Sequence, residues 1–144
     1  MNTKMLNVAI SENDTEKKDY LSKRINKSEA FHLIAAAENG YELIKLLNVC
    51  KLPPDIVFAN VHTPIMDGIL TAIYLRLSFP NVKVYCTSKY TDDITIRQAL
   101  TVSNGYLWNK FESDEDKKEL DNLLKSIHEV GSYFPHFPFI STSD

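Results

Sequence analysis

The stretch PDIVFANVHTPIMDG, which covers residues 54–68, decides the fold. It begins with an apolar run of strand length at 56–59, passes a Thr-Pro breaker, and reaches Asp67 and Gly68, which mark the start of a helix. Asn60 therefore lies at the carboxyl end of a buried strand. In open α/β sheets this edge is where ligands and chemistry collect.

The composition is typical of one soluble globular domain. The chain has 144 residues, of which 44% are hydrophobic and 24% charged, and its net charge is −3. This charge gives no electrostatic case for DNA binding by this domain alone. No apolar run reaches the roughly 18 residues of a membrane span, and the N-terminus does not resemble a signal peptide. We expect no membrane contact, a cytoplasmic location, and Cys50 and Cys86 buried as small apolar groups.

Strands and helices alternate along the chain. The expected strands are 6–10, 31–37, 56–59, 82–87 and 106–109, and the expected helices are 15–25, 41–50, 68–78, 91–101 and 114–130. Five strands that alternate with five helices imply an α/β doubly wound fold, a parallel sheet covered on both faces. Thr91 is a candidate N-cap. The candidate core contacts of helix 68–78 are Ile69, Ala72, Ile73 and Leu77.

Polar side chains follow four of the five expected strands. They are Glu12 and Asn13 after the first strand, Asn60 after the third, Ser88 after the fourth and Lys110 after the fifth. Because the carboxyl ends of parallel strands meet at one edge of a sheet, these side chains should converge on one cleft.

In order and spacing, these four segments resemble the receiver domains of two-component response regulators, the CheY-like family. They match the family's acidic pair, its phosphoacceptor strand with the Met-Asp-Gly turn, its Ser/Thr and its lysine. The segment 127–135 resembles the end of receivers of the NarL/LuxR type. The resemblance covers about residues 6–134. It implies a flavodoxin-like (βα)5 fold with a five-stranded parallel sheet of order 2-1-3-4-5, a receiver domain at 1–130, and a linker or tail at 131–144.

Two of the three acidic positions of the family pattern carry amides. Asn60 stands where the family has the Asp that accepts phosphate, and Asn13 stands where it has a second acid that ligates Mg²⁺. A side-chain amide cannot form a normal acyl phosphate, and only Glu12 keeps a negative charge. We therefore expect no cofactor, or Mg²⁺ bound weakly at most through Asn13, Asn60 and the backbone carbonyl of His62.

Lys110 occupies the position of the family's phosphate-binding lysine. We expect it to pair with Glu12 and to hydrogen-bond the Asn60 oxygen, which would leave a neutral cleft. The family has Lys-Pro here with a cis bond, whereas this chain has Phe111 after the lysine. Since a cis bond before a non-proline residue costs about 3 kcal/mol, we predict a trans bond and a shifted loop.

Ser88 and Tyr106 occupy the positions with which the family switches. In the family, the hydroxyl moves toward the phosphoryl group and the aromatic ring turns inward. Without a phosphoryl group nothing pulls Ser88 inward. Either another ligand or partner biases this switch, or Tyr106 packs permanently against helix 91–101.

The leading hypothesis is a non-enzymatic, atypical receiver that regulates by protein–protein contact without phosphorylation at Asn60. The family implies helix 91–101, strand 106–109 and helix 114–130 as the surface for a protein partner or a second copy. A histidine kinase is the less favoured partner here. Two alternatives stay open: a working phosphoacceptor receiver, and the regulatory half of a LuxR-type DNA-binding transcription regulator whose effector domain is absent from this chain. We expect the tail, with Phe134, Phe137 and Phe139, to be mobile rather than docked.

Overall fold

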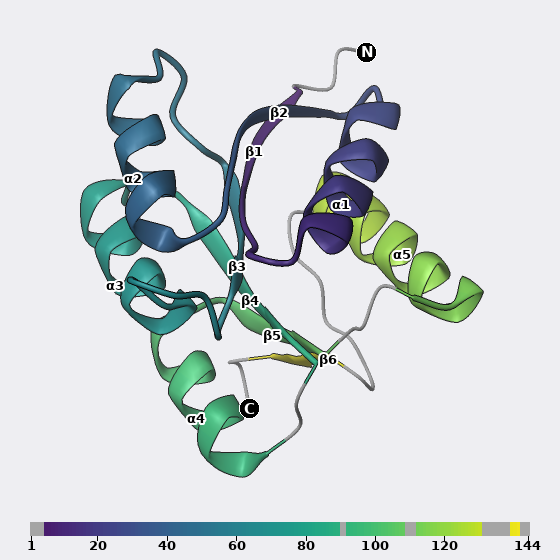
Figure 1. The fold of residues 1–144 in the computed structure, drawn as a ribbon. Coiled ribbons are helices and arrows are strands. Elements are labelled where there is room, and N and C mark those ends of the chain that lie inside the picture. The colour runs from purple at the N-terminus through teal and green to yellow at the C-terminus, as the bar shows by residue number, and fades with distance from the viewer. Residues whose placement is uncertain (1–4, 90–91, 109–111, 131–138, 142–144) are drawn as a thin grey trace.

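A computed structural model of the chain describes residues 5–89, 92–108, 112–130 and 139–141. The strands are β1 (Leu6–Ser11), β2 (Phe31–Ala37), β3 (Ile56–Asn60), β4 (Lys83–Ser88), β5 (Gly105–Trp108) and β6 (Phe139–Ser141). The helices are α1 (Thr15–Lys27), α2 (Gly40–Val49), α3 (Gly68–Ser78), α4 (Asp93–Val102) and α5 (Asp114–Val130). Along this part of the chain, strands and helices alternate from β1 to α5, as predicted (Figure 1).

The first five strands are parallel and lie in the order β2-β1-β3-β4-β5, which confirms the predicted topology. The described sheet has a sixth strand, so the five-strand prediction was incomplete. β6 pairs antiparallel with β5, and Tyr106 lies opposite Ile140. The expectation of a mobile tail is therefore wrong for 139–141. The reason is physical: the edge of β5 offers unpaired backbone groups, and this short segment carries an aromatic and a β-branched residue.

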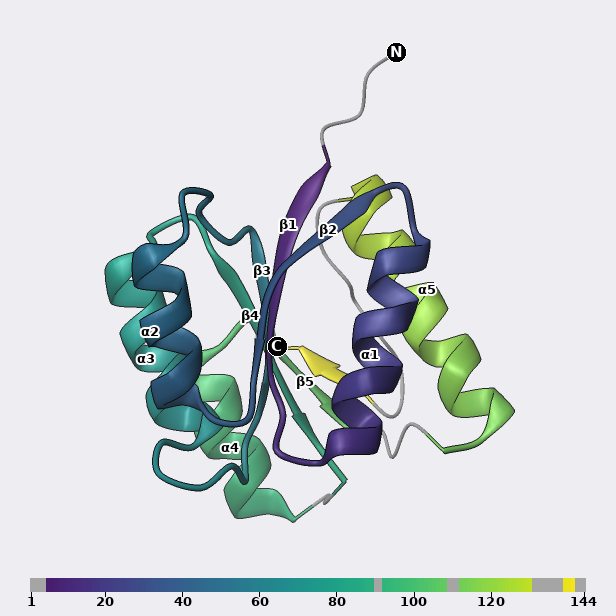
Figure 2. The same cartoon turned by 45° about the horizontal axis from the view of Figure 1, so that its top comes forward.

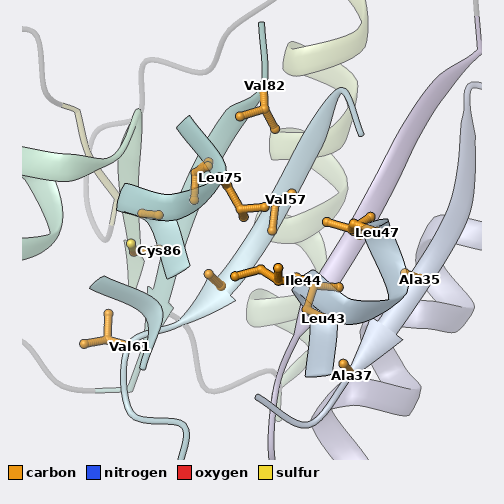
Figure 3. Close-up of a cluster of buried hydrophobic side chains, with 14 of the residues drawn as sticks. Ala35, Ala37, Leu43, Ile44, Leu47, Val57, Val61, Leu75, Val82 and Cys86 are labelled. Carbon is orange, nitrogen blue, oxygen red and sulfur yellow. The ribbon is translucent and has the colours of Figure 1, made fainter. Parts of the chain in front are cut away.

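Helices cover both faces of the sheet. Figure 2 shows α1 and α5 on one face and α2, α3 and α4 on the other. In β3, Ile56 and Phe58 join the core under α1 and α5, whereas Val57 and Ala59 join the core under the other three helices. Figure 3 shows the second cluster around Val57. Successive side chains of a strand point to opposite faces, so a strand that is apolar throughout requires a cover on both sides.

An Asp or Asn side chain caps the N-terminus of four of the described helices. The N-caps are Asp14 for α1, Asn39 for α2, Asp67 for α3 and Asp92 for α4, and each accepts a hydrogen bond from the backbone N–H three residues on. The predicted Thr91 cap is wrong, because Asp92 caps α4 through the Thr95 N–H, while Thr91 lies outside the described residues. The hydrogen bonds from Thr95 hold the pKa of Asp92 below its usual value.

The face of α3 that meets the core differs from the prediction. Ile73 and Leu77 are exposed by 40% and 80%, whereas Ala72 is buried as expected. The residues of α3 that are buried are Gly68, Thr71, Ala72 and Leu75. The close approach of α2 explains this choice: a Cβ on Gly40 would lie 1.7 Å from the Thr71 Oγ1. Only a residue without a side chain fits at position 40 opposite Thr71, so this contact places Thr71 on the buried face of α3.

The two cysteines differ in burial. Cys86 lies in the core on β4, as predicted, whereas Cys50 is a half-buried C-cap of α2 rather than a helix-interior residue. Both are free thiols. None of the helices within the described ranges combines the length and the apolar character that crossing a membrane requires.

Candidate functional site

The ends of β1 and β3 bring Glu12 beside Asn60. The parallel register sets Ser11 next to Ala59, so the residues that follow each of these positions are neighbours at the edge of the sheet. The Glu12 backbone N–H donates to the Ala37 carbonyl at 2.9 Å, which holds the end of β1 against β2. The predicted convergence of these two strand ends is therefore present in the structure.

Glu12 and Asn60 form a closed hydrogen-bonded pair. The Asn60 Nδ2 donates to the Glu12 Oε1 at 2.8 Å, and the Glu12 Oε2 accepts from the Asp14 backbone N–H at 2.9 Å. The Asn60 Oδ1 accepts from the His62 backbone N–H at 2.7 Å. Both carboxylate oxygens and both amide heavy atoms thus have a partner. Glu12 is only 2% exposed, and a buried carboxylate is tolerated when it is hydrogen-bonded in this way.

These contacts fix the orientation of the Asn60 amide. A flipped amide would set its NH₂ group against the His62 N–H and its oxygen against the Glu12 carboxylate. Each of those contacts is repulsive. The side of the amide that faces the acid therefore carries hydrogens rather than an oxygen.

The arrangement of Glu12, Asn13 and Asn60 does not fit Mg²⁺, which takes several oxygen ligands. The Asn60 oxygen is directed to a backbone N–H, the two Glu12 oxygens accept hydrogen bonds, and Asn13 is exposed to solvent. In the ranges that the structure describes, no three His, Cys, Asp or Glu side chains gather into a group that could hold a metal ion.

Ser88 of β4 and Tyr106 of β5 lie together. Both are buried, with exposed fractions of 2% and 0%, and their side chains are hydrogen-bonded. Burial raises the pKa of the Tyr106 hydroxyl, and the hydrogen bond with Ser88 opposes this rise. The ring belongs to the same apolar cluster as Ala99 of α4 and Cys86 of β4. Tyr106 therefore occupies an inward position, packed beneath α4.

The chain matches no protein-family model. It is 26% identical over 132 residues to the transcriptional regulatory protein LnrK of Bacillus subtilis, a match that covers 91% of this chain and 57% of LnrK. It is 27% identical over 104 residues to the chemotaxis protein CheY of Listeria monocytogenes, covering 72% of this chain and 86% of that protein. The isolated receiver domain of RcsB from Salmonella enterica, solved with the phosphomimetic BeF₃⁻, superposes with a TM-score of 0.76 at 18% identity, over 92% of this chain and 94% of the other.

The chain has the receiver fold, and its sequence is similar to those of response regulators. It spans a little over half the length of LnrK. The structural match shows the shared fold, and the two relatives show a similarity in sequence.

One position of this receiver's site lies outside the described residues. Lys110 and the bond to Phe111 fall in the range 109–111, so the predicted pairing with Glu12 and the predicted trans bond stay predictions. Within the described residues, Glu12 accepts hydrogen bonds from the Asn60 side chain and from the Asp14 backbone N–H. The acid is thus satisfied by two N–H donors.

The loop between β3 and α3 of this receiver holds several features that the sequence-based reasoning missed. Thr63 Oγ1 donates to the Met66 carbonyl at 2.7 Å, and Ile65 has a φ of 68°, in the left-handed region. A Cβ on Gly68 would lie 2.5 Å from the Asn60 carbonyl oxygen. Gly68 is therefore required for the start of α3 to approach Asn60. The Asp67-Gly68 pair signalled a helix start but gave no sign of this contact.

Proposed function

We propose that this receiver is a regulatory module that acts through contacts with other proteins and takes no phosphoryl group on residue 60. The observation that carries the proposal is the amide of Asn60, hydrogen-bonded at both its nitrogen and its oxygen. A phosphoacceptor must offer a carboxylate oxygen as the nucleophile. The Asn60 nitrogen has its lone pair delocalised into the amide, and it donates to Glu12 rather than facing an incoming phosphorus atom.

Glu12 has a different role under this proposal. In a phosphorylated receiver the acids hold a cation that offsets the charge of the phosphoryl group. Here the carboxylate of Glu12 accepts from the amide of Asn60 at 2.8 Å and from the Asp14 N–H at 2.9 Å. Glu12 therefore positions the Asn60 side chain, and their hydrogen bond joins the carboxyl ends of β1 and β3.

The family pattern supports α4, β5 and α5 as the surface for a protein partner. In this chain β6 occupies the outer edge of β5, so a partner there would meet β6 in place of the β5 edge. The first turn of α4 adds an apolar contact point, because Ile94 is 71% exposed. Receivers contact kinases and effector domains, and we infer that here an effector or regulatory protein is favoured over a histidine kinase.

Phosphoryl transfer from a small donor tests the proposal. The protein is incubated with acetyl phosphate and Mg²⁺, and the intact mass is measured for a gain of about 80 Da, the size of one phosphoryl group. We expect no gain for the natural chain. Asn60→Ala is the matched control, and Asn13→Asp/Asn60→Asp restores both acids and should take up phosphate. A gain in the natural chain that disappears in Asn60→Ala would overturn the proposal.

The comparison with LnrK favours a second candidate function, the regulatory half of a transcription regulator. LnrK is named a transcriptional regulatory protein, and the chain matches 57% of its length. A helix-turn-helix segment encoded in frame after codon 144 would support this function. A stop codon at that point would contradict it.

A further inference from the structure

The outer face of α3 carries an apolar stripe with no cover in the described structure. It consists of Leu70, Ile73, Tyr74 and Leu77, named here the α3 stripe, whose exposed fractions are 54%, 40%, 39% and 80%. Their spacing of i, i+3, i+4 and i+7 places them on one side of the helix. This spacing is the pattern by which a helix packs against another helix.

The stripe lies opposite the face that α3 buries in its own domain. Thr71, Ala72 and Leu75 face the sheet and α2, and Figure 3 shows Leu75 within that cluster. α3 is thus apolar on both sides, and Arg76 is its single charged residue. In soluble proteins a helix that is apolar all round is covered all round. The stripe is therefore an apolar surface that is open to a partner.

We propose that the α3 stripe is a self-association surface, on which two copies of this receiver pack α3 against α3 in antiparallel orientation about a two-fold axis. A two-fold interface needs a patch that is complementary to itself. The stripe meets this requirement, because Leu70 and Leu77 are its two ends and Ile73 and Tyr74 its centre. An antiparallel pair sets Leu70 of one copy beside Leu77 of the other, with the central residues next to the axis.

The shape beside the stripe fits the same arrangement. An open hollow of about 370 Å³ lies between α3 and α4 and includes Leu70 in its wall. The most exposed member of the stripe is Leu77, at the other end. Antiparallel pairing brings the protruding Leu77 of each copy to the hollow beside Leu70 of the second copy.

The available area is sufficient for a dimer of modest affinity. With about 200 Å² for a fully exposed large apolar side chain, the exposed fractions of the stripe amount to roughly 400 Å² per copy. Interfaces are about 60% apolar, which scales this to about 700 Å² per copy and about 1,400 Å² in total. Stable interfaces bury about 1,200–2,000 Å². No charged residue lies within the stripe itself.

Sedimentation equilibrium of the natural chain, from about 1 to 200 µM, tests the proposal. We expect a monomer–dimer equilibrium whose dissociation constant falls within this concentration range. Leu77→Lys should raise that constant at least about tenfold, while a cation near the C-terminus of α3 leaves the helix intact. Val49→Lys is the matched control, because Val49 is 81% exposed on α2, and it should leave the constant unchanged.

A charge exchange at the axis gives a positive readout. Ile73→Lys and Ile73→Glu should each be monomeric alone, because like charges meet near the two-fold axis. Mixed in equal amounts, the two variants should form a heterodimer. Circular dichroism spectra that match the natural chain establish that each variant is folded.

Two results would overturn the α3 pairing. One is a natural chain that stays monomeric over the whole concentration range. The other is a dimer that Ile94→Glu dissociates but Leu77→Lys does not, because this dimer would use the α4 surface. Neither result bears on phosphoryl uptake at residue 60, so failure of this inference is distinguishable from failure of the proposed function.

Discussion

Replacing Asn60 by Asp should destabilise this receiver at neutral pH in the absence of a divalent cation. The substitution turns the Nδ2 donor, 2.8 Å from the Glu12 Oε1, into a second carboxylate oxygen. A charge-assisted hydrogen bond of about 1.5–3 kcal/mol is lost. A repulsion of up to about 4 kcal/mol replaces it, the value for two unit charges 4 Å apart at an effective dielectric constant of 20.

Asn60→Asp should lower the free energy of unfolding by about 2–4 kcal/mol, because water and proton binding relieve part of the repulsion. Asn60 is half-buried, so solvent screens its new charge to some extent. Two carboxylates at this distance also raise the pKa of one of them, and the protonated acid can then donate to the other. A raised folded-state pKa contributes stability at low pH that is lost as the pH rises. The destabilisation of Asn60→Asp should therefore shrink between about pH 7 and pH 5.

Urea unfolding at both pH values measures this effect. The variants are Asn60→Asp, Asn60→Ala and Glu12→Gln/Asn60→Asp, and the double variant should recover most of the stability because it restores an amide donor to the carboxylate. Added Mg²⁺ should stabilise Asn60→Asp by ligand linkage and leave the natural chain unchanged. If Asn60→Asp proves as stable as the natural chain at about pH 7 without Mg²⁺, the amide–carboxylate pair does not hold the site as described.

Three further outcomes are expected. Gly68→Ala should lower the free energy of unfolding by about 1–3 kcal/mol, because its Cβ would lie 2.5 Å from the Asn60 carbonyl oxygen; urea unfolding measures the loss. Tyr106→Phe should cost about 1 kcal/mol through the lost hydrogen bond with Ser88, and a double-mutant cycle with Ser88→Ala measures the coupling. Burial raises the pKa of the Cys86 thiol to about 12. The contribution of this thiol to stability should therefore be complete below about pH 8.5 and should fall as the pH rises toward 12. Cys86→Ala should remove this decrease of the free energy of unfolding with pH, which a series of unfolding curves measures.

The α/β class and the position of the cleft were predictable from the sequence because each depends on a local pattern, whereas the strand order was predicted from the resemblance to receiver domains. An apolar run that ends in a polar residue marks a buried parallel strand and its carboxyl end at once. Glu12 and Asn60 follow such runs, and the structure brings them within hydrogen-bonding distance. Tyr106 is buried on β5 in the same cluster as Ala99 of α4, and this position fits both of the possibilities left open.

The face of α3 was not predictable from apolar spacing, because apolar residues surround the whole helix. The contact between Gly40 and Thr71 selects the buried face of α3, and these two residues are 31 positions apart in the sequence. The pairing of β6 with β5 likewise depends on a long-range edge contact, which the residues 139–141 do not reveal by themselves. Periodicity shows only which residues of one element are apolar. Which face of a helix is buried, and whether a segment pairs as a strand, depends on the residues of the neighbouring element.

The amide at position 60 has a structural consequence beyond the loss of an acceptor. Glu12 is a carboxylate with 2% exposure, and burying an acid is costly unless donors surround it. In a receiver with three acids, a bound cation offsets their charge. Here, among the described residues, the Asn60 NH₂ and the Asp14 N–H supply a donor to each Glu12 oxygen. Asn60 and Glu12 therefore depend on each other, and reverting the amide alone should leave a site that is less stable than either the natural pair or a complete acidic set with its cation.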